Sequence, residues 1–95
     1  MITAAQAKEK TKERLRVLAE EFIINYIGIP IQNAIDKGKF FTRVPLEGKL
    51  ISEVDSEALG EVVVKILEEQ GFEAEHVFID NHQCHENYIL IKWEN

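Results

Sequence analysis

Residues 22–31 read Phe-Ile-Ile-Asn-Tyr-Ile-Gly-Ile-Pro-Ile, and this stretch decides how the chain can fold. It lies inside a run of apolar residues, from Leu15 to Ile35, whose spacings of three and four are typical of a helix face. Pro30 lacks a backbone N–H, and its ring clashes with the preceding turn of a helix. We therefore expect one long helix that kinks or breaks in two at residues 28–30.

Capping residues mark both ends of this helix. Thr3 and Gln6 have the spacing of a capping box, in which each side chain binds a backbone N–H of the first turn. The helix should therefore begin near Ala4. Gly38 suits the position just beyond the helix end, where the left-handed backbone conformation favours glycine.

A second helix is predicted between Asp55, a good N-cap residue, and Gly71. Gly71 and Phe72 occupy the positions that end a helix in a Schellman motif. Gly60 has no role in a cap or a turn, so it indicates close packing against this helix. The apolar stripe of the helix contains Leu59, Val62, Val63, Ile66 and Leu67.

The rest of the chain predicts strands. Residues 39–46 alternate in polarity, and Pro45 places this strand at a sheet edge or near a strand end; Leu50-Ile51 adds a short returning strand. Residues 72–80 and 87–93 are typical of a hairpin joined by a polar loop. Because the alternation drifts along the first of these strands, we expect a bulge near Glu75 or His76.

This order of helix, strand, helix, strand, strand indicates an α+β fold for residues 1–95 as a single domain. The long kinked N-terminal helix and the second helix would form one layer, and a small, mainly antiparallel sheet the other. A right-handed crossover leaves a gap for the last strand, so the predicted strand order is first, third, second, with antiparallel neighbours.

Apolar side chains point in nearly every direction around residues 22–31. Ile24, Ile27 and Ile31 form a stripe distinct from the face that carries Leu18 and Phe22. Burying both stripes favours a homo-oligomer, with Ile24, Ile27 and Ile31 at the interface. Alternatively, a break at Pro30 folds the second helical piece back and hides both stripes within one monomer.

Charge excludes several classes of function. The net charge is −6, and residues 51–95 carry two basic and eleven acidic side chains, so specific nucleic-acid binding is not expected. The basic residues of the segment 8–16 are typical of a solvated helix face, although such a run could also touch phosphate or an acidic partner. No apolar run is long enough to span a membrane, and no signal peptide is visible, so we expect a cytoplasmic protein.

The residues with the richest chemistry gather in and beside the hairpin loop: His76, His82, Cys84 and His85. Imidazole and thiolate are common metal ligands, but one loop and one strand end lack the paired motifs of a structural zinc site. The simplest interpretation is a solvated loop without metal, cofactor or catalytic role. Speculatively, these four residues bind a ligand, because loops from neighbouring subunits could complete a metal or nucleotide site.

Four segments of the chain carry a resemblance: Ile-Thr-x-x-x-Ala at residues 2–7, Ala-Ile-Asp-Lys-Gly-Lys at 34–39, Glu-Gln-Gly-Phe at 69–72 and Tyr-Ile-Leu-Ile-Lys-Trp at 88–93. Over most of its length, the chain resembles short, largely uncharacterised proteins encoded by phages and prophages. The resemblance implies a role such as inhibiting or sequestering a component of host defence, and it assigns no site residue.

These features together predict a non-enzymatic, phage-related accessory protein that acts as a homo-oligomer and binds a host protein or a small ligand. The alternative is a metal- or nucleotide-binding site that is assembled across subunits from His76, His82, Cys84 and His85.

Overall fold

The computed structural model describes residues 1–46, 56–80, 83 and 85–93, and these form a two-layer α+β fold. The predicted order of helix, strand, helix, strand, strand is confirmed. The elements are α1 (Ala4–Phe22), the π-helical turn η1 (Ile23–Ile27), α2 (Gly28–Asp36), β1 (Phe41–Pro45), α4 (Ser56–Glu69), β2 (Glu73–Asp80) and β3 (His85–Lys92).

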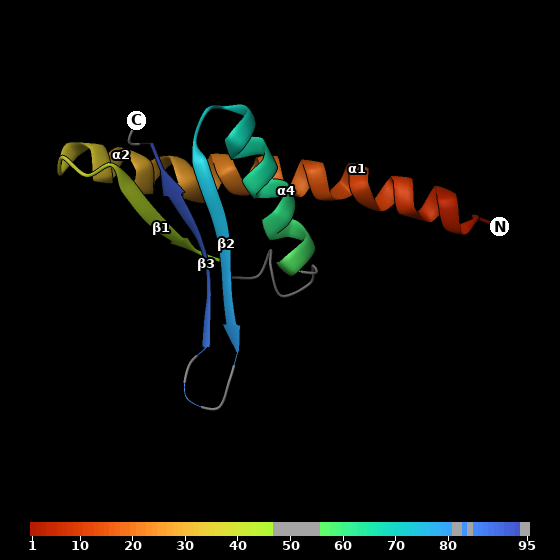
Figure 1. The fold of residues 1–95 in the computed structure, drawn as a ribbon. Helices are drawn as coiled ribbons and strands as arrows, with labels where there is room; N and C mark the ends of the chain where they lie inside the picture. The colour runs from red at the N-terminus through yellow and green to blue at the C-terminus, as the bar shows by residue number, and fades with distance from the viewer. Residues whose placement is uncertain (47–55, 81–82, 84, 94–95) are drawn as a thin grey trace.

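The long helix is not broken at Pro30. Segments α1, η1 and α2 follow one another as a single rod (Figure 1), and the irregularity is a wide turn that precedes the proline. The backbone N–H of Gly28 donates to the carbonyl of Ile23, five residues earlier, instead of four. This wider spacing accommodates the proline, which cannot donate to the turn before it.

The wide turn also changes which residues share a face. In a regular helix, Phe22 and Tyr26 would lie one above the other. The extra residue brings Ile27 onto the buried face, although the Tyr26 ring still lies 5.3 Å from that of Phe22. Phe22 and Ile27 are both buried, whereas Tyr26 is 47% exposed. The buried face therefore continues from Phe22 through Ile27 to Ala34, while Ile24 and Ile29 stay exposed.

The helix caps predicted at Thr3, Gly38 and Gly71 are confirmed. Thr3 and Gln6 form the reciprocal hydrogen bonds of a capping box. Gly38 and Gly71 have positive φ angles of 74° and 93°. In each case the next residue donates its N–H to the carbonyl five residues before it, as a Schellman motif requires: Lys39 to Ala34 and Phe72 to Leu67.

The described strands form one antiparallel sheet in the order β1-β3-β2, as predicted. Pairing between β2 and β3 is continuous from Glu73 opposite Lys92 to Asp80 opposite His85, so the expected bulge near Glu75 or His76 is absent from this ladder. The drift in polarity instead reflects β2 extending past the helices. Pro45 lies on edge strand β1, where its missing N–H breaks no ladder bond.

The core lies between the helices and one face of the sheet. α4 packs against both α1 and β2, and α2 lies beside β1. Trp93 packs at the border of this core with its ring edge toward Phe72, at 6.2 Å between centroids. The fully or nearly fully buried side chains include Leu18, Phe22, Ile27, Val44, Leu59, Val63, Leu67, Ile89 and Ile91.

One surface ion pair links the two helices. Arg16 of α1 donates to Glu69 of α4 at 3.2 Å and also to Glu20 at 3.1 Å. These hydrogen bonds, that with Glu69 first, raise the pKa of Arg16, which stays protonated. The pair is exposed, so it orients the helices more than it stabilises them.

Two predicted features lie outside the described residues: the N-cap Asp55 and the returning strand at Leu50-Ile51. Among the helices that the structure describes, none combines the length and apolarity needed to cross a membrane.

Changes in the length of the wide turn test whether it keeps Phe22 and Ile27 on one face of the helix. Deletion of Asn25, an exposed residue of η1, restores a four-residue step between Phe22 and Ile27 and keeps both on one face, so the chain should still fold cooperatively. Insertion of one alanine after Asn25 turns the Ile27 face about 120° away from the core and should abolish cooperative unfolding. Urea unfolding followed by circular dichroism distinguishes the two; equal effects would contradict the phase argument.

Candidate functional site

His76, the predicted site residue that the structure describes in full, is built into the protein's packing. It lies on the helix-covered side of β2, and its Nε2 is 2.6 Å from Oδ1 of Asn87 on β3. Its ring lies against α4 at Gly60, where an added Cβ would approach two ring carbons within 2.7 Å. The close packing expected at Gly60 is therefore confirmed, and the imidazole is its partner.

This environment determines what His76 can do chemically. Since Oδ1 of Asn87 is an acceptor, Nε2 carries the proton and donates to it. The other nitrogen, Nδ1, faces the backbone of α4 at Gly60. Both ring nitrogens thus point into the protein, which favours a structural role over metal ligation or base catalysis.

The other predicted ligand-binding residues lie wholly or partly outside the described structure. His82 and Cys84 lie outside the described residues, and so does the side chain of His85, whose backbone pairs with Asp80 at the end of the hairpin. Within the part of the chain that the structure describes, no three His, Cys, Asp or Glu side chains gather as a metal site would require.

The three predicted interface residues of the long helix differ in their exposure to solvent. Ile24 is 77% exposed, Ile31 is partly buried, and Ile27 is buried within one copy. The expectation that these three form one exposed stripe is therefore wrong for Ile27, because the wide turn rotates it onto the core face. Ile24 remains an exposed apolar residue without the other two beside it.

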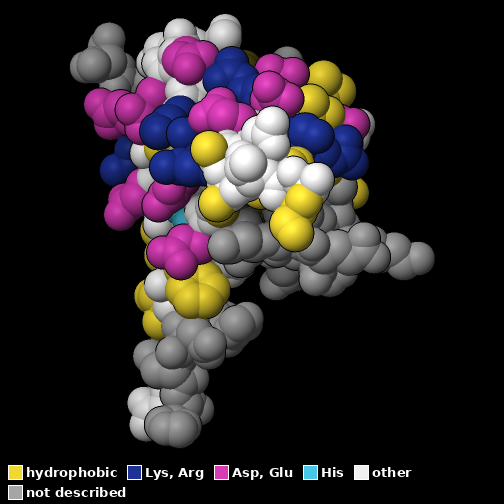
Figure 2. Space-filling model, turned by 90° about the vertical axis from the view of Figure 1, so that its right-hand side faces the viewer, with side chains coloured by type: hydrophobic (Ala, Val, Ile, Leu, Met, Phe, Trp, Pro, Cys, Tyr) yellow, Lys and Arg dark blue, Asp and Glu magenta, His cyan; other side chains and the backbone are white. Residues whose placement is uncertain are grey.

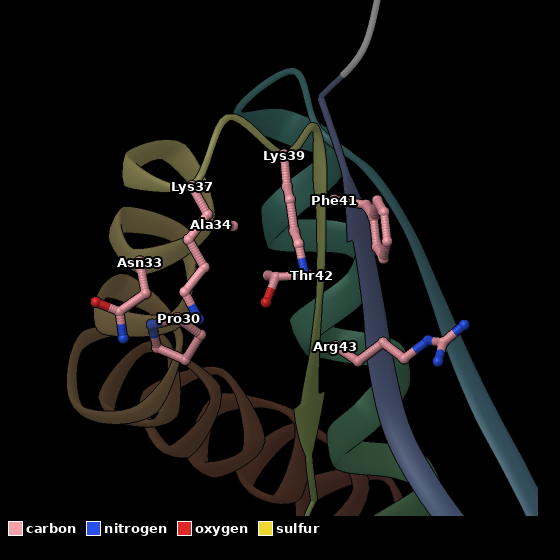
Figure 3. Close-up of a pocket in the computed structure, with 8 residues that line it drawn as sticks. All are labelled: Pro30, Asn33, Ala34, Lys37, Lys39, Phe41, Thr42 and Arg43. Carbon is pink, nitrogen blue, oxygen red and sulfur yellow. The ribbon is translucent and has the colours of Figure 1, made fainter.

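A cleft of about 370 Å³ separates α2 from β1 (Figure 3). Lys37, Lys39 and Thr42 line it together with Asn33, whereas Arg43 points to the opposite side of β1. The two lysines follow the C-terminal end of α2, where cations offset the partial negative charge of the free carbonyls. The cleft is open, and its lysines have this role without any ligand.

The second face of the sheet is a further surface with apolar side chains. Helices α1 and α4 cover the face that carries Val44, Ile89 and Ile91, so the alternate residues point the other way. We call this second surface the open face. Its residues are Phe41, Arg43 and Pro45 of β1, Glu73, Glu75, Val77 and Ile79 of β2, and Glu86, Tyr88, Leu90 and Lys92 of β3.

The open face is only partly shielded from water. Phe41 is 45% exposed and Ile79 is 37% exposed, while Val77, Tyr88 and Leu90 are half-buried. Arg43 stacks over the ring of Tyr88, with its guanidinium carbon 5.7 Å from the centroid. Two hollows flank Leu90 and Lys92, one of about 370 Å³ beside Phe41 and Arg43, and one of about 140 Å³ beside Glu73 and Glu75.

A sheet with one packed face has a second side that faces water, and the alternation in polarity along residues 39–46 predicts such a strand. The signal that identifies the open face is the apolar character of the wet side, where Phe41, Tyr88 and Leu90 stand at positions that a solvated sheet fills with polar residues. The pairing register, which the sequence does not reveal, places these residues on the same side of the sheet.

The remaining surface carries mixed charge. On the side toward which the N-terminal end of α1 points, Lys and Arg are interspersed with Asp and Glu (Figure 2). Glu9 bridges Lys12 within the segment 8–16, at 3.9 Å. This distribution supports the expectation of a solvated helix face there.

Comparisons with protein-family models, with curated proteins and with solved structures find no match to this chain.

Gly60 and Gly28 provide a matched pair of substitutions. Gly60→Ala should destabilise the protein by about 1–3 kcal/mol, because the new methyl group overlaps the His76 ring. Gly28→Ala meets no atom within 4 Å at a helical φ of −57° and should stabilise it by about 0.5–1 kcal/mol. Urea unfolding measures both.

The same experiment includes its control. If the His76 ring causes the loss, Gly60→Ala combined with His76→Ala should cost clearly less than the sum of the two single substitutions. Additive losses would show that Gly60 is required for another reason.

Proposed function

We propose that this protein is a non-enzymatic binding protein that works as a homo-oligomer and uses the open face as its contact surface. The observation that carries the proposal is the half-exposed apolar centre of that face, formed by Tyr88, Leu90 and Val77. An antiparallel sheet that faces only water carries polar side chains on that side. Apolar side chains there are stabilised when a partner covers them.

Binding is favoured over catalysis by the state of the described histidine. His76 directs one nitrogen to Asn87 and the other to α4, so it offers no group to a substrate. The hollows of the open face contain carboxylates, cations and aromatic rings at the surface, which suits protein contact.

The biological setting is part of the proposal. The resemblance to short phage proteins supports an accessory role against a host protein in the host cytoplasm. The metal- or nucleotide-binding alternative rests on His76, His82, Cys84 and His85. Of these, His76 is described in full, and its contacts with Asn87 and α4 do not favour ligation.

Self-association tests the proposal. The native chain should sediment as an oligomer that dissociates on dilution. Leu90→Lys should shift it to monomer, because it places a charge in the middle of the open face. The folded monomer should tolerate this lysine, since Glu75 lies directly opposite on β2 and offsets the like charge of Arg43 on β1.

Ile24→Ser is the matched control. It removes an exposed apolar side chain from the long helix and should leave the association unchanged. A chain that is monomeric at every concentration, or one that dissociates with Ile24→Ser but not with Leu90→Lys, would overturn the assignment of the open face. Unfolding curves confirm that each variant is folded.

A further inference from the structure

We propose that the outer edge of β1 binds an extended acidic segment of a partner protein, which joins the sheet as a further antiparallel strand in the cleft between β1 and α2. This inference goes beyond the proposed function, because it uses an edge of the sheet (Figure 1) and does not depend on self-association. Two observations carry it: unpaired backbone groups on β1, and a cleft that lysines line and, among the described residues, no carboxylate lines.

The backbone groups of β1 point alternately toward β3 and toward the cleft. At one end of the pairing, Trp93 donates its N–H to the carbonyl of Phe40 at 3.0 Å, and at the other end Leu46 donates to β3 at 2.9 Å. The even-numbered residues of β1 therefore face β3, since the direction alternates along an antiparallel strand. The N–H and C=O groups of Phe41 and Arg43 point to the outer edge, where the described structure gives them no hydrogen-bond partner.

The cleft gives access to this edge. Phe41 and Arg43 line it, although their side chains lie on the open face, where they also line the hollow beside Leu90 (Figure 3). Their backbone therefore forms the wall of the cleft. Its volume of about 370 Å³ lies within the usual range of ligand sites, roughly 300–1,000 Å³, so α2 leaves room for a short extended segment beside the edge.

Charge selects the kind of segment. Lys37 and Lys39 are exposed and line the cleft, and no Asp or Glu does so in the part of the chain that the structure describes. Asp36, the acidic residue nearest to them in sequence, accepts a hydrogen bond from Gln32 at 3.1 Å instead. A chain with a net charge of −6 thus has a locally positive site here, which attracts carboxylates.

The lysines and Pro45 also act against unwanted pairing. Lysine beside an exposed edge and proline on it are common protections against the aggregation of strands. Pro45 has no N–H to offer, so full pairing is confined to Phe41 and Arg43. Lys37 and Lys39 repel a basic strand and attract an acidic one, which makes this protection selective.

Strand geometry determines how the segment lies. An antiparallel partner exchanges both N–H and C=O hydrogen bonds with Phe41 and with Arg43. The partner residues that make these bonds direct their side chains to the open-face side, because residues directly opposite each other share a face. The residues between them point toward the helix layer, on the side of Lys37 and Lys39. We therefore expect carboxylates at alternate positions of the segment.

N-methylated peptides test the pairing. The probe is a fluorescein-labelled peptide of sequence Thr-Glu-Val-Glu-Val-Thr, and fluorescence anisotropy measures its binding to the native chain. Methylation of the two valine nitrogens removes the N–H groups that face β1 and should weaken binding at least tenfold. Methylation of the two glutamate nitrogens, which face away, should change the Kd less than threefold. Equal effects of the two methylations would overturn strand pairing, because the lysines would then attract charge alone.

Charge reversal tests the cleft. Lys37→Glu and Lys39→Glu should each weaken binding of the unmethylated peptide about fivefold, because each replaces an attraction by a repulsion. Lys65→Glu makes the same change of charge at an exposed position of α4 and should stay within about twofold of the native chain. Equal losses from all three variants would overturn the assignment to this cleft. Urea unfolding confirms that each variant is folded.

The outcomes separate this inference from the proposed function. Leu90→Lys leaves the edge of β1 intact, so it should still bind the peptide as a monomer. If the native chain never associates but binds the peptide with the expected methylation effects, the edge site stands and the proposed function is wrong. If the chain associates and the unmethylated peptide fails to bind at about 1 mM, the edge site is wrong and the proposed function stands.

Discussion

The structure depends on one constraint: the apolar residues must stay on one side of a long helix that contains a proline. Phe22 and Ile27 must both reach the core, and a regular helix cannot place residues five positions apart on one face. The π-helical turn over residues 23–27 solves this by adding a residue to the turn, with Gly28 bonded to Ile23. The same wide turn leaves room for Pro30, so one local distortion meets both requirements.

This distortion determines which surfaces remain for binding. Because Ile27 turns inward, the rod and α4 bury their apolar residues against a single face of the sheet within one chain. Of the apolar side chains in the segment 22–31, those that stay exposed include Ile24 and Ile29. The open face, whose half-buried apolar centre adjoins exposed charged residues, is the surface that we propose for a partner.

Much of the fold was predictable because its signals are local. Thr3, Gly38 and Gly71 mark helix ends through hydrogen bonds within a few residues, and Pro45 marks an edge strand by its missing donor. The π-helical turn was not predictable from spacing, since the same residues fit two stripes on a regular helix. The choice between them is made by packing against distant residues such as Ile89 and Val63.

The candidate site was less predictable for a related reason. His, Cys and carboxylate side chains are the usual candidates for a functional site in a sequence. His76, however, is held between Asn87 and Gly60, which lie 11 and 16 positions away. The open face, in contrast, consists of ordinary residues whose importance depends on strand register. Register is a non-local property, fixed by the core face of each strand.

The most direct test of the account measures the solvent exposure of single methyl groups by NMR with a soluble paramagnetic agent. Ile27 should be protected at every protein concentration, while Ile24, three residues away, should be strongly broadened at every concentration. Leu90 should be broadened in dilute solution and protected when the protein is concentrated. Equal broadening of Ile24 and Ile27 in dilute solution would contradict the account, because the helix would then lack the turn on which the rest of the structure depends.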